Sequence, residues 1–398
     1  MQFSLKENFI KNRVSSILLL IGGFLFIIAY FLNTEYVMSS NLRLLKYISL
    51  VLISTSIFMI LIKRKKVILG NIILFILMFI LIELLCFFML GMPDALNKDF
   101  SLPLMPKEHI STHLGTVAYS DSVYHEVLIK DNDTVYDVLN SIDENNLRIT
   151  PGHKLENKEY ALFFGCSIAF GTGLNDDQTF PYHFQENSKK YNSYNYAYPG
   201  YGTNHMLARM EYQDLSKDVV EKNGKAFYIF FWDHINRSIG AMSHYTEWVS
   251  NAPFYTFKDN ELIRNKKFKD GRYTISKAYE LIYQLNIIKK FDIGFPVELN
   301  EKHYDLVSEI ILKSKETYKK QFGNSEFYVV FYPNYMKYTN AQLKEFKTYL
   351  TKKDIEYIDL NKVIKYGSEH TLGGDPHPNS NTNQLISKEL LNRINKLN

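Results

Sequence analysis

Cysteine is scarce in this sequence, with two residues in a chain of 398. Cys86 lies inside an apolar run and Cys166 lies in the segment FFGCSIAF, so the two do not indicate a disulfide framework. With so few cysteines, cysteine usage does not report the redox compartment of the protein.

An excess of charge of one sign is also missing, because the formal net charge is only +4. No basic run interleaved with aromatic residues occurs in the C-terminal part, which argues against a nucleic-acid partner. The histidines at 183, 205 and 370 have no metal-ligand spacing with one another or with nearby carboxylates. We therefore expect no metal site.

Long apolar runs are present, and they are confined to residues 1–91. Residues 14–32 carry no charge, and about 20 such residues suffice for a helix that crosses a membrane. Residues 47–62 and 67–90 are further runs of this kind. Three transmembrane helices are predicted in preference to a cleaved signal peptide, since no small-residue cleavage pattern follows the first run, and to buried helices of a soluble core.

Lysine and arginine are distributed unevenly around the three runs. Basic residues precede the first run, and the run KRKK at 63–66 separates the second from the third, whereas the first loop carries only Arg43 and Lys46. The positive-inside rule makes the N-terminus and the second loop cytoplasmic. The prediction is a multi-pass protein of the cell inner (cytoplasmic) membrane whose domain after Gly91 is extracytoplasmic.

Glu83 interrupts the third apolar run. A carboxylate is costly in lipid, so it marks a functional site, a partner-facing position in the helix bundle, or a place near the membrane interface. Its position toward the outer end of the run fits the interface at least as well as the other two.

Beyond the membrane region, residues 92–133 are expected to form a linker and leading strands. Three prolines between 93 and 106 indicate the linker, and the Val, Tyr and Leu alternation of 113–150 indicates short strands that form a cap or a leading hairpin.

The region 134–398 has the pattern of an α/β domain. Apolar runs at 160–164, 226–232, 327–333 and 355–360 are separated by helical patterns at 302–320, 341–352 and 382–397. Such runs predict a mostly parallel sheet that is buried on both faces and has its site at the carboxyl ends of the strands. Residues 240–300 read as an irregular insertion near that site.

Ser167 follows the first of these strands directly, within FFGCSIAFGTGLNDDQTFPYHF (163–184). A strand followed by a tight, glycine-flanked turn would fix a nucleophile and expose its oxygen. The N-terminus of the helix that follows would offer backbone N–H groups to a developing oxyanion.

A base and its carboxylate partner occur together near the C-terminus, in GGDPHPNSNTNQLISKELL (373–391). A nucleophilic serine needs a base, and a carboxylate that holds the tautomer of that base improves it. Asp375 and His377 would supply both groups from one loop. Together with Ser167 they form the candidate catalytic triad.

These segments resemble the conserved blocks of the SGNH/GDSL serine hydrolases. The usual Gly-Asp-Ser of the first block stands here as Gly165-Cys166-Ser167, and NYAYPGYGTNHM (195–206) is similar to the second block, with Gly200 at the place of the oxyanion glycine. Taken alone, that glycine pattern is more often a simple turn. The resemblance covers about 134–398, including IDENNLRITP (142–151), and implies a three-layer α/β/α, flavodoxin-like fold.

The third block departs from the family pattern. The family has Gly-x-Asn-Asp, in which the Asn donates to the oxyanion, whereas this chain has FFWDHINR (230–237). Asp233 as a carboxylate cannot donate, so His234 is the favoured third donor, with Asn236 or two backbone donors alone as alternatives. Equally, Asp233 and His234 could form a buried structural pair.

The resemblance implies two-step acyl transfer through an acyl-enzyme, which requires no cofactor. The expected substrate is an O-acyl group on a cell-envelope glycan or lipid. The spacing Asp-x-His resembles a subset of the family that includes polysaccharide O-acetyltransferases, and a transferase with so few spans would need a partner membrane protein as its acyl carrier. A catalytically weak binding protein with the same fold is the third possibility.

The basic-residue asymmetry gives the first testable prediction. A reporter enzyme that works only outside the cytoplasm should be active when fused after Asn398, and inactive when fused after Lys66 as the matched control. Activity of a cytoplasm-dependent reporter after Asn398 would overturn the predicted orientation.

Overall fold

The computed structural model describes residues 15–27, 40–63, 67–90, 100–101, 109–130, 132–245, 247–323, 326–333 and 339–397. The chain forms two compact units. One comprises Met1–Asn97 and Leu281–Ile293, and the other comprises Lys98–Glu280 and Gly294–Asn398. We call them the helical unit and the α/β unit.

The helical unit contains a helix at Ser15–Ile27, α2 at Ser40–Lys63 and α3 at Val67–Met89. Two stretches are long and apolar enough to cross a membrane, Leu44–Leu61 and Leu69–Met89, with mean hydropathies of 2.1 and 3.1. The first predicted span is described only as the shorter helix, and its last part, 28–32, lies outside the described residues. Two candidate spans are therefore supported, and a third is not confirmed.

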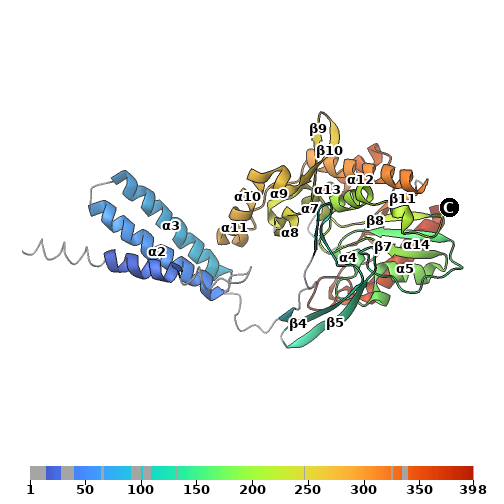
Figure 1. Cartoon of the computed structure of the whole chain (residues 1–398), viewed down its shortest axis with the longest axis horizontal. Coiled ribbons are helices and arrows are strands. Elements are labelled where there is room, and N and C mark those ends of the chain that lie inside the picture. Colours follow the sequence, from blue (N-terminus) through green and yellow to red (C-terminus); the bar gives the residue numbers. More distant parts are fainter. Residues whose placement is uncertain are drawn as a thin grey trace, which may run out of the picture. The chain divides into compact units, whose positions relative to one another are not determined.

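These helices pack through small and aromatic residues, and α2 and α3 run side by side (Figure 1). A Cβ added to Gly22 of the first helix would lie 2.8 Å from Ile53 Cγ1 of α2, so only glycine permits this approach. The rings of Tyr47 on α2 and Phe87 on α3 are 6.1 Å apart. Phe75, in contrast, is 73% exposed on the outer surface of α3, as expected for a side chain that faces lipid.

The α/β unit is built on a five-stranded parallel sheet. Its strands are β6 (Glu159–Phe164), β7 (Tyr191–Asn195), β8 (Asn223–Phe230), β11 (Phe327–Phe331) and β12 (Tyr357–Asp359), in the order β12-β11-β8-β6-β7. The four predicted strands are confirmed, and β7 was missed. In chain order this is the flavodoxin-like arrangement 2-1-3-4-5, whose switch point lies between β6 and β8.

Helices cover both faces of this sheet, as the apolar runs predicted. On one face lie α5 (Phe180–Ser188) and α14 (Ser380–Leu397); on the other lie α6 (Thr203–Tyr212), α12 (Glu301–Phe322) and α13 (Asn340–Lys352) (Figure 1). Successive side chains of a strand point to opposite faces. Phe163 and Leu162 of β6 accordingly enter the two different cores, and neither has any exposed surface.

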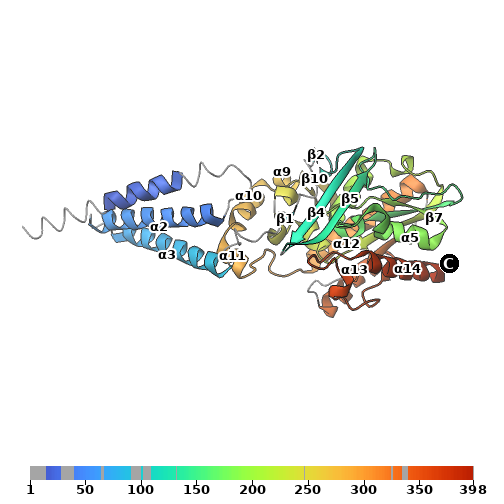
Figure 2. The same ribbon diagram turned by 90° about the horizontal axis from the view of Figure 1, so that it is seen from below.

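The leading strands form hairpins that pack within the α/β unit. Strands β4 (Ser122–Lys130) and β5 (Asp133–Ile142) make a long antiparallel hairpin, with β1 (Phe100–Ser101) at its edge (Figure 2). A shorter pair joins β2 (His109–Ser111) to β3 (Gly115–Val117). The expected leading hairpin is present, and it crosses the division that the sequence suggested at residue 134.

The insertion at 240–300 is not irregular, which corrects the expectation from sequence. It contains an antiparallel hairpin of β9 (Pro253–Lys258) and β10 (Glu261–Lys267), whose connecting residues Asp259 and Asn260 both have positive φ. Two such residues give the tight turn that matches strand twist. The helices around it are α8 (Glu247–Ser250), α9 (Phe268–Gly271), α10 (Tyr273–Ile282) and α11 (Asn286–Lys290).

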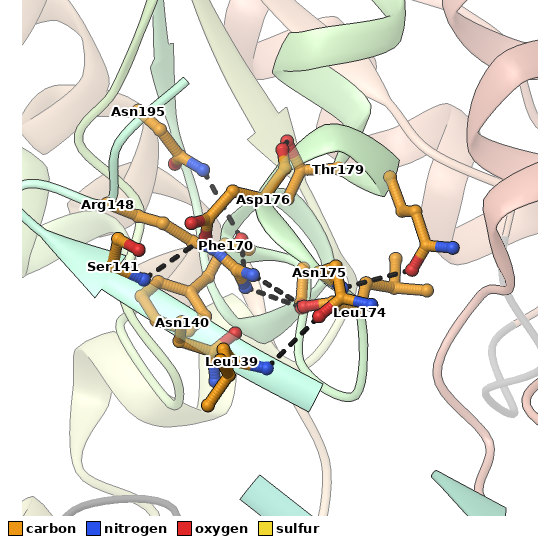
Figure 3. A network of polar contacts seen from close by, with 12 residues as sticks. Leu139, Asn140, Ser141, Arg148, Phe170, Leu174, Asn175, Asp176, Thr179 and Asn195 are labelled. Carbon is orange, nitrogen blue, oxygen red and sulfur yellow. Dashed lines mark hydrogen bonds and ion pairs between the residues drawn. The ribbon is translucent and has the colours of Figure 1, made fainter. Parts of the chain in front are cut away.

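A fully buried arginine organises the loop after β6 (Figure 3). The guanidinium of Arg148 donates to the carbonyl oxygens of Phe170, Gly171 and Leu174, and to Asp176 Oδ1 at 3.1 Å. Burial lowers the pKa of Arg148 to about 10, although Asp176 opposes this shift. The side chain therefore stays charged at neutral pH.

Replacement of this arginine should destabilise the α/β unit. Arg148→Met would leave three loop carbonyls without their donor and Asp176 without its partner, which we expect to cost on the order of 3–5 kcal/mol of the free energy of unfolding. Denaturant unfolding followed by circular dichroism measures this loss. The control Arg393→Met removes an exposed arginine that pairs only with Glu389 and should change stability by less than about 0.5 kcal/mol. Equal midpoints for the two variants would contradict the role of Arg148.

Candidate active site

Ser167 begins a very short helix, α4 (Ser167–Phe170), directly beyond the carboxyl end of β6. The turn into it requires glycine, since a Cβ on Gly165 would lie 3.1 Å from the Ile229 carbonyl oxygen of β8. Gly171 ends the helix with a φ of 90°. As the first helical residue, Ser167 has a backbone N–H with no acceptor inside its own helix.

The structure brings the three residues of the candidate triad together. His377 Nε2 lies 2.8 Å from Ser167 Oγ, and His377 Nδ1 lies 2.5 Å from Asp375 Oδ1. The same carboxylate oxygen accepts the backbone N–H of His377 at 2.8 Å. The side chains of His377 and Asp375 are 23% and 17% exposed, so the triad is partly open to solvent.

Asp375 is held in its ionised form. Burial raises the pKa of this carboxyl, but the hydrogen bonds and charge of His377 outweigh burial, so the net shift is downward. A carboxylate at this position fixes His377 with Nδ1 protonated and leaves Nε2 free to accept a proton. This arrangement can remove the proton from Ser167 Oγ as that oxygen attacks a carbonyl carbon.

The loop that carries His377 is fixed by Asn379, the asparagine of the Pro-Asn pair. Its side-chain nitrogen donates to the carbonyl oxygens of Glu369 at 2.8 Å and Thr371 at 3.0 Å. Its side-chain oxygen accepts the N–H of Thr382 at 2.9 Å and so caps α14. A single amide therefore joins the loop to the helix behind it, which keeps the imidazole in place.

The β4–β5 hairpin adds a wall beside the triad that was not anticipated from sequence. The Lys130 ammonium donates to the carbonyl oxygen of Gly374, and the ring of Tyr136 lies where a Cβ on Gly173 would approach to 2.9 Å. Burial, then the charges of Glu126 and Asp375, raise the pKa of Tyr136, so it remains a neutral phenol. Only their position on a predicted leading strand could have drawn attention to these residues.

Gly200, the expected oxyanion glycine, lies in the loop after β7 with a φ of 75°. The loop is joined to the nucleophile turn by the N–H of Tyr198, which donates to the Gly165 carbonyl oxygen at 3.3 Å. Within the described part of the chain, the Gly200 N–H donates to no protein acceptor. It is available to a ligand, as the oxyanion role requires.

His234 lies in the wrong place for the oxyanion role expected of it. It begins α7 (His234–Ile239) with a side chain that has no exposed surface, and its Nδ1 lies 2.7 Å from the Tyr228 hydroxyl. Its Nε2 is sealed from solvent and has no partner in the described residues. Burial lowers the pKa of His234 well below its usual value. A substrate cannot reach this nitrogen.

Asp233 does not pair with His234 either, so the structural alternative is also corrected. Its carboxylate receives Arg237 Nε at 2.8 Å and lies 2.8 Å from His244 Nε2, while Asn236 Nδ2 points to it at 3.5 Å. Burial raises the pKa of Asp233, but His244 and Arg237 outweigh it and hold the pKa far below its usual range. Asn236 is thus directed to Asp233.

Arg237 is the residue of the third block that sequence reasoning missed. Its guanidinium donates to Asp233 and to the Tyr201 carbonyl oxygen, and it contacts the side chain of Cys166, next to Ser167. Burial lowers its pKa, but Cys166 and Asp233 raise it further, so a permanent positive charge lies beside the nucleophile turn. The Asp233–Arg237 spacing of i, i+4 on a helix was a readable signal for this pair.

Comparisons with known proteins were made against families, curated proteins and solved structures. No family model and no curated protein match the chain. Three matching structures are as follows. TesA is 9% identical with a TM-score of 0.38, covering 60% of this chain and 100% of its own. A lipolytic G-D-S-L family protein from Veillonella parvula is 12% identical with a TM-score of 0.35, covering 60% and 99%. An acetyl xylan esterase from Butyrivibrio proteoclasticus is 11% identical with a TM-score of 0.36, covering 62% and 66%.

The chain is thus similar to solved proteins that include a member of the lipolytic G-D-S-L family, which its motifs resemble. Similarity at these identities and TM-scores carries no argument about activity. The function is therefore inferred from the geometry of the site.

Asp375→Asn tests whether the carboxylate serves His377. The amide can no longer hold the tautomer or stabilise the imidazolium, so ester turnover should fall on the order of 10³- to 10⁴-fold while the fold persists. The measurement is kcat on a chromogenic ester beside a circular dichroism spectrum. Asp177→Asn, which alters an exposed aspartate, is the matched control. Wild-type turnover in folded Asp375→Asn would remove Asp375 from the triad.

Proposed function

We propose that the chain is a serine esterase of the SGNH/GDSL type that acts on O-acyl groups of cell-envelope glycans or lipids. The observation that carries this proposal is the continuous hydrogen-bonded series from Ser167 Oγ through His377 to Asp375. A serine, an imidazole and a carboxylate in this order are the parts that nucleophilic acyl transfer requires.

In the first step, Ser167 Oγ attacks the ester carbonyl carbon while its proton moves to His377 Nε2. The imidazolium that forms is stabilised by Asp375, which accepts the Nδ1 proton in a hydrogen bond. The tetrahedral intermediate then collapses, and His377 returns the proton to the departing alcohol oxygen. The product of this step is an acyl group esterified to Ser167.

In the second step, His377 removes a proton from the acceptor, which attacks the acyl carbonyl carbon and releases Ser167. Water as the acceptor gives a hydrolase. A sugar hydroxyl as the acceptor gives a polysaccharide O-acetyltransferase, which would draw its acyl group from a partner membrane protein. The same acyl-enzyme serves both reactions.

The negative charge that develops on the carbonyl oxygen would be received by the N–H groups of Ser167 and Gly200. The first is free because it begins a helix, and the second has no protein acceptor among the described residues. Arg237 adds a fixed positive charge beside Cys166. Two backbone donors and this charge take the place of the side-chain donor expected at His234.

A membrane location with the α/β unit outside the cytoplasm is part of the proposal. It depends on the basic run at 63–66 and on α3, because a cytoplasmic loop before α3 directs everything after Met89 to the outer side. The orientation of α3 therefore does not require the first helix to cross the membrane. Envelope glycans and lipids are the esters available on that side.

Labelling with a fluorophosphonate probe tests the nucleophile without knowledge of the substrate. The probe should label the full chain, and Ser167→Ala should abolish the labelling, since the probe forms a bond with an activated serine oxygen. Ser216→Ala is the matched control, because its hydroxyl bonds only Asp214 on a distant turn. Folded wild-type protein that resists the probe would favour a binding protein that retains the fold.

A further inference from the structure

Glu83 is an anomaly in α3, because its neighbours on the helix are turned outward and it is not. Ile82 and Leu85 are 43% and 59% exposed, whereas Glu83 is 2% exposed. A carboxylate in an apolar span must find hydrogen-bond donors or incur a large desolvation cost. The donors identify what covers this side of the helix.

The donors come from α11, which lies two hundred residues later in the chain. Glu83 Oε2 accepts the N–H of Asn286 at 2.8 Å, and Glu83 Oε1 accepts the N–H of Ile287 at 3.0 Å. The Asn286 side chain donates to the Tyr47 hydroxyl at 2.6 Å, and that hydroxyl donates to Glu83 at 3.2 Å. Glu83 thus caps the first turn of a helix from the insertion.

A second contact holds the far end of α11. The ammonium of Lys290 donates to the carbonyl oxygen of Met89, the last residue of α3, at 3.0 Å. Residues 281–293 accordingly belong to the helical unit, although the chain on both sides of them belongs to the α/β unit. Three backbone connections rather than one therefore join the two units.

The depth of this attachment matches a membrane interface. Glu83 lies six residues before the end of α3, which is about 9 Å at a rise of roughly 1.5 Å per residue. Helices that lie in the interface bury their apolar side about 5–10 Å into the headgroup and acyl boundary. If α3 spans the bilayer, the first turn of α11 lies in that zone.

The surface of the segment is also suited to lipid. Leu281, Phe291 and Ile293 are 70%, 61% and 38% exposed, which is unusual for large apolar side chains gathered within thirteen residues. Lys289 and Lys290 lie in the last turn, where long basic side chains can reach lipid phosphates. The apolar side chains and the basic pair are the two components of an interfacial anchor.

We propose that residues 281–293 insert into the outer leaflet of the membrane as an interfacial anchor, with Leu281 and Phe291 in contact with lipid and Glu83 fastening α11 to α3. This rests on the proposed membrane crossing of α3. The anchor keeps the α/β unit at the membrane surface, where lipid-linked or surface-bound esters are found.

Spin labels on the full chain in nanodiscs of phosphatidylethanolamine and phosphatidylglycerol test this anchor. Single cysteines replace Leu281 or Phe291 in a Cys86→Ser, Cys166→Ala background, and the label is relaxed by oxygen, which enters lipid, or by a nickel chelate, which stays in water. The ratio of oxygen to nickel accessibility should be several-fold higher at 281 and 291 than at the control Leu155→Cys, which replaces a side chain that is 92% exposed in the α/β unit.

A label at Phe75 of α3 separates the anchor from the membrane proposal itself. A lipid signal at 75 with an aqueous signal at 291 would overturn the anchor alone, and an aqueous signal at 75 would overturn both. A label at 291 that neither reagent reaches would indicate a protein contact and also overturn the lipid anchor. In Glu83→Gln, which weakens the cap of α11, the label at 291 should shift toward the aqueous signal, while Glu389→Gln on α14 should leave it unchanged.

Discussion

The candidate site depends on one buried cation, Arg148, because the helix that presents Ser167 cannot maintain itself. A four-residue helix is far below the length at which helical hydrogen bonds offset the cost of nucleation, and its last carbonyl groups have no partner within the helix. Arg148 donates to two of them, at Phe170 and Gly171, and its charge lies at the negative end of the helix dipole. The amide of Asn195 at the end of β7 supports the same turn by donating to the carbonyl oxygens of Ala169 and Phe170. The nucleophile turn is thus built on polar groups that are fixed from beneath.

The base reaches Ser167 from the other end of the chain, and its loop has separate supports. Asn379 and Lys130 hold backbone carbonyls of the His377 loop without touching the nucleophile turn. Sheet order supplies the rest, since β6 and β8 flank the switch point where the connections diverge to opposite faces. Two loops that are each rigid need only a correct sheet to meet, which accounts for a 2.8 Å contact between residues 210 positions apart.

The apolar runs predicted the central strands because both faces of a parallel sheet are buried, and the helices followed from their periodicity. Strand β7, with the sequence YNSYN, escaped notice because it pairs only with β6 and lies at an edge. There its polar side chains take hydrogen bonds that a neighbouring strand would otherwise supply, as Asn192 does with Lys154. The Ser167, Asp375 and His377 grouping could be proposed from motifs, because those residues stand at strand ends or in one short loop. His234 could not be placed, because a position after a strand does not say whether a side chain turns toward the site or into the core. The contact of Glu83 with Asn286 joins distant segments, and no local pattern announces it.

The third block shows how the same residue types acquire different roles from their surroundings. Asp375 meets an imidazole that also reaches Ser167, whereas Asp233 is enclosed by Arg237 and His244 and has no free acceptor directed at the triad. Loss of one oxyanion donor reduces turnover on the order of 10²- to 10³-fold in enzymes that use it. A site left with two backbone donors would therefore be slow unless another positive group acts on the developing charge. Asp233 holds Arg237 against Cys166, so the carboxylate that cannot donate to an oxyanion instead positions a cation next to the nucleophile.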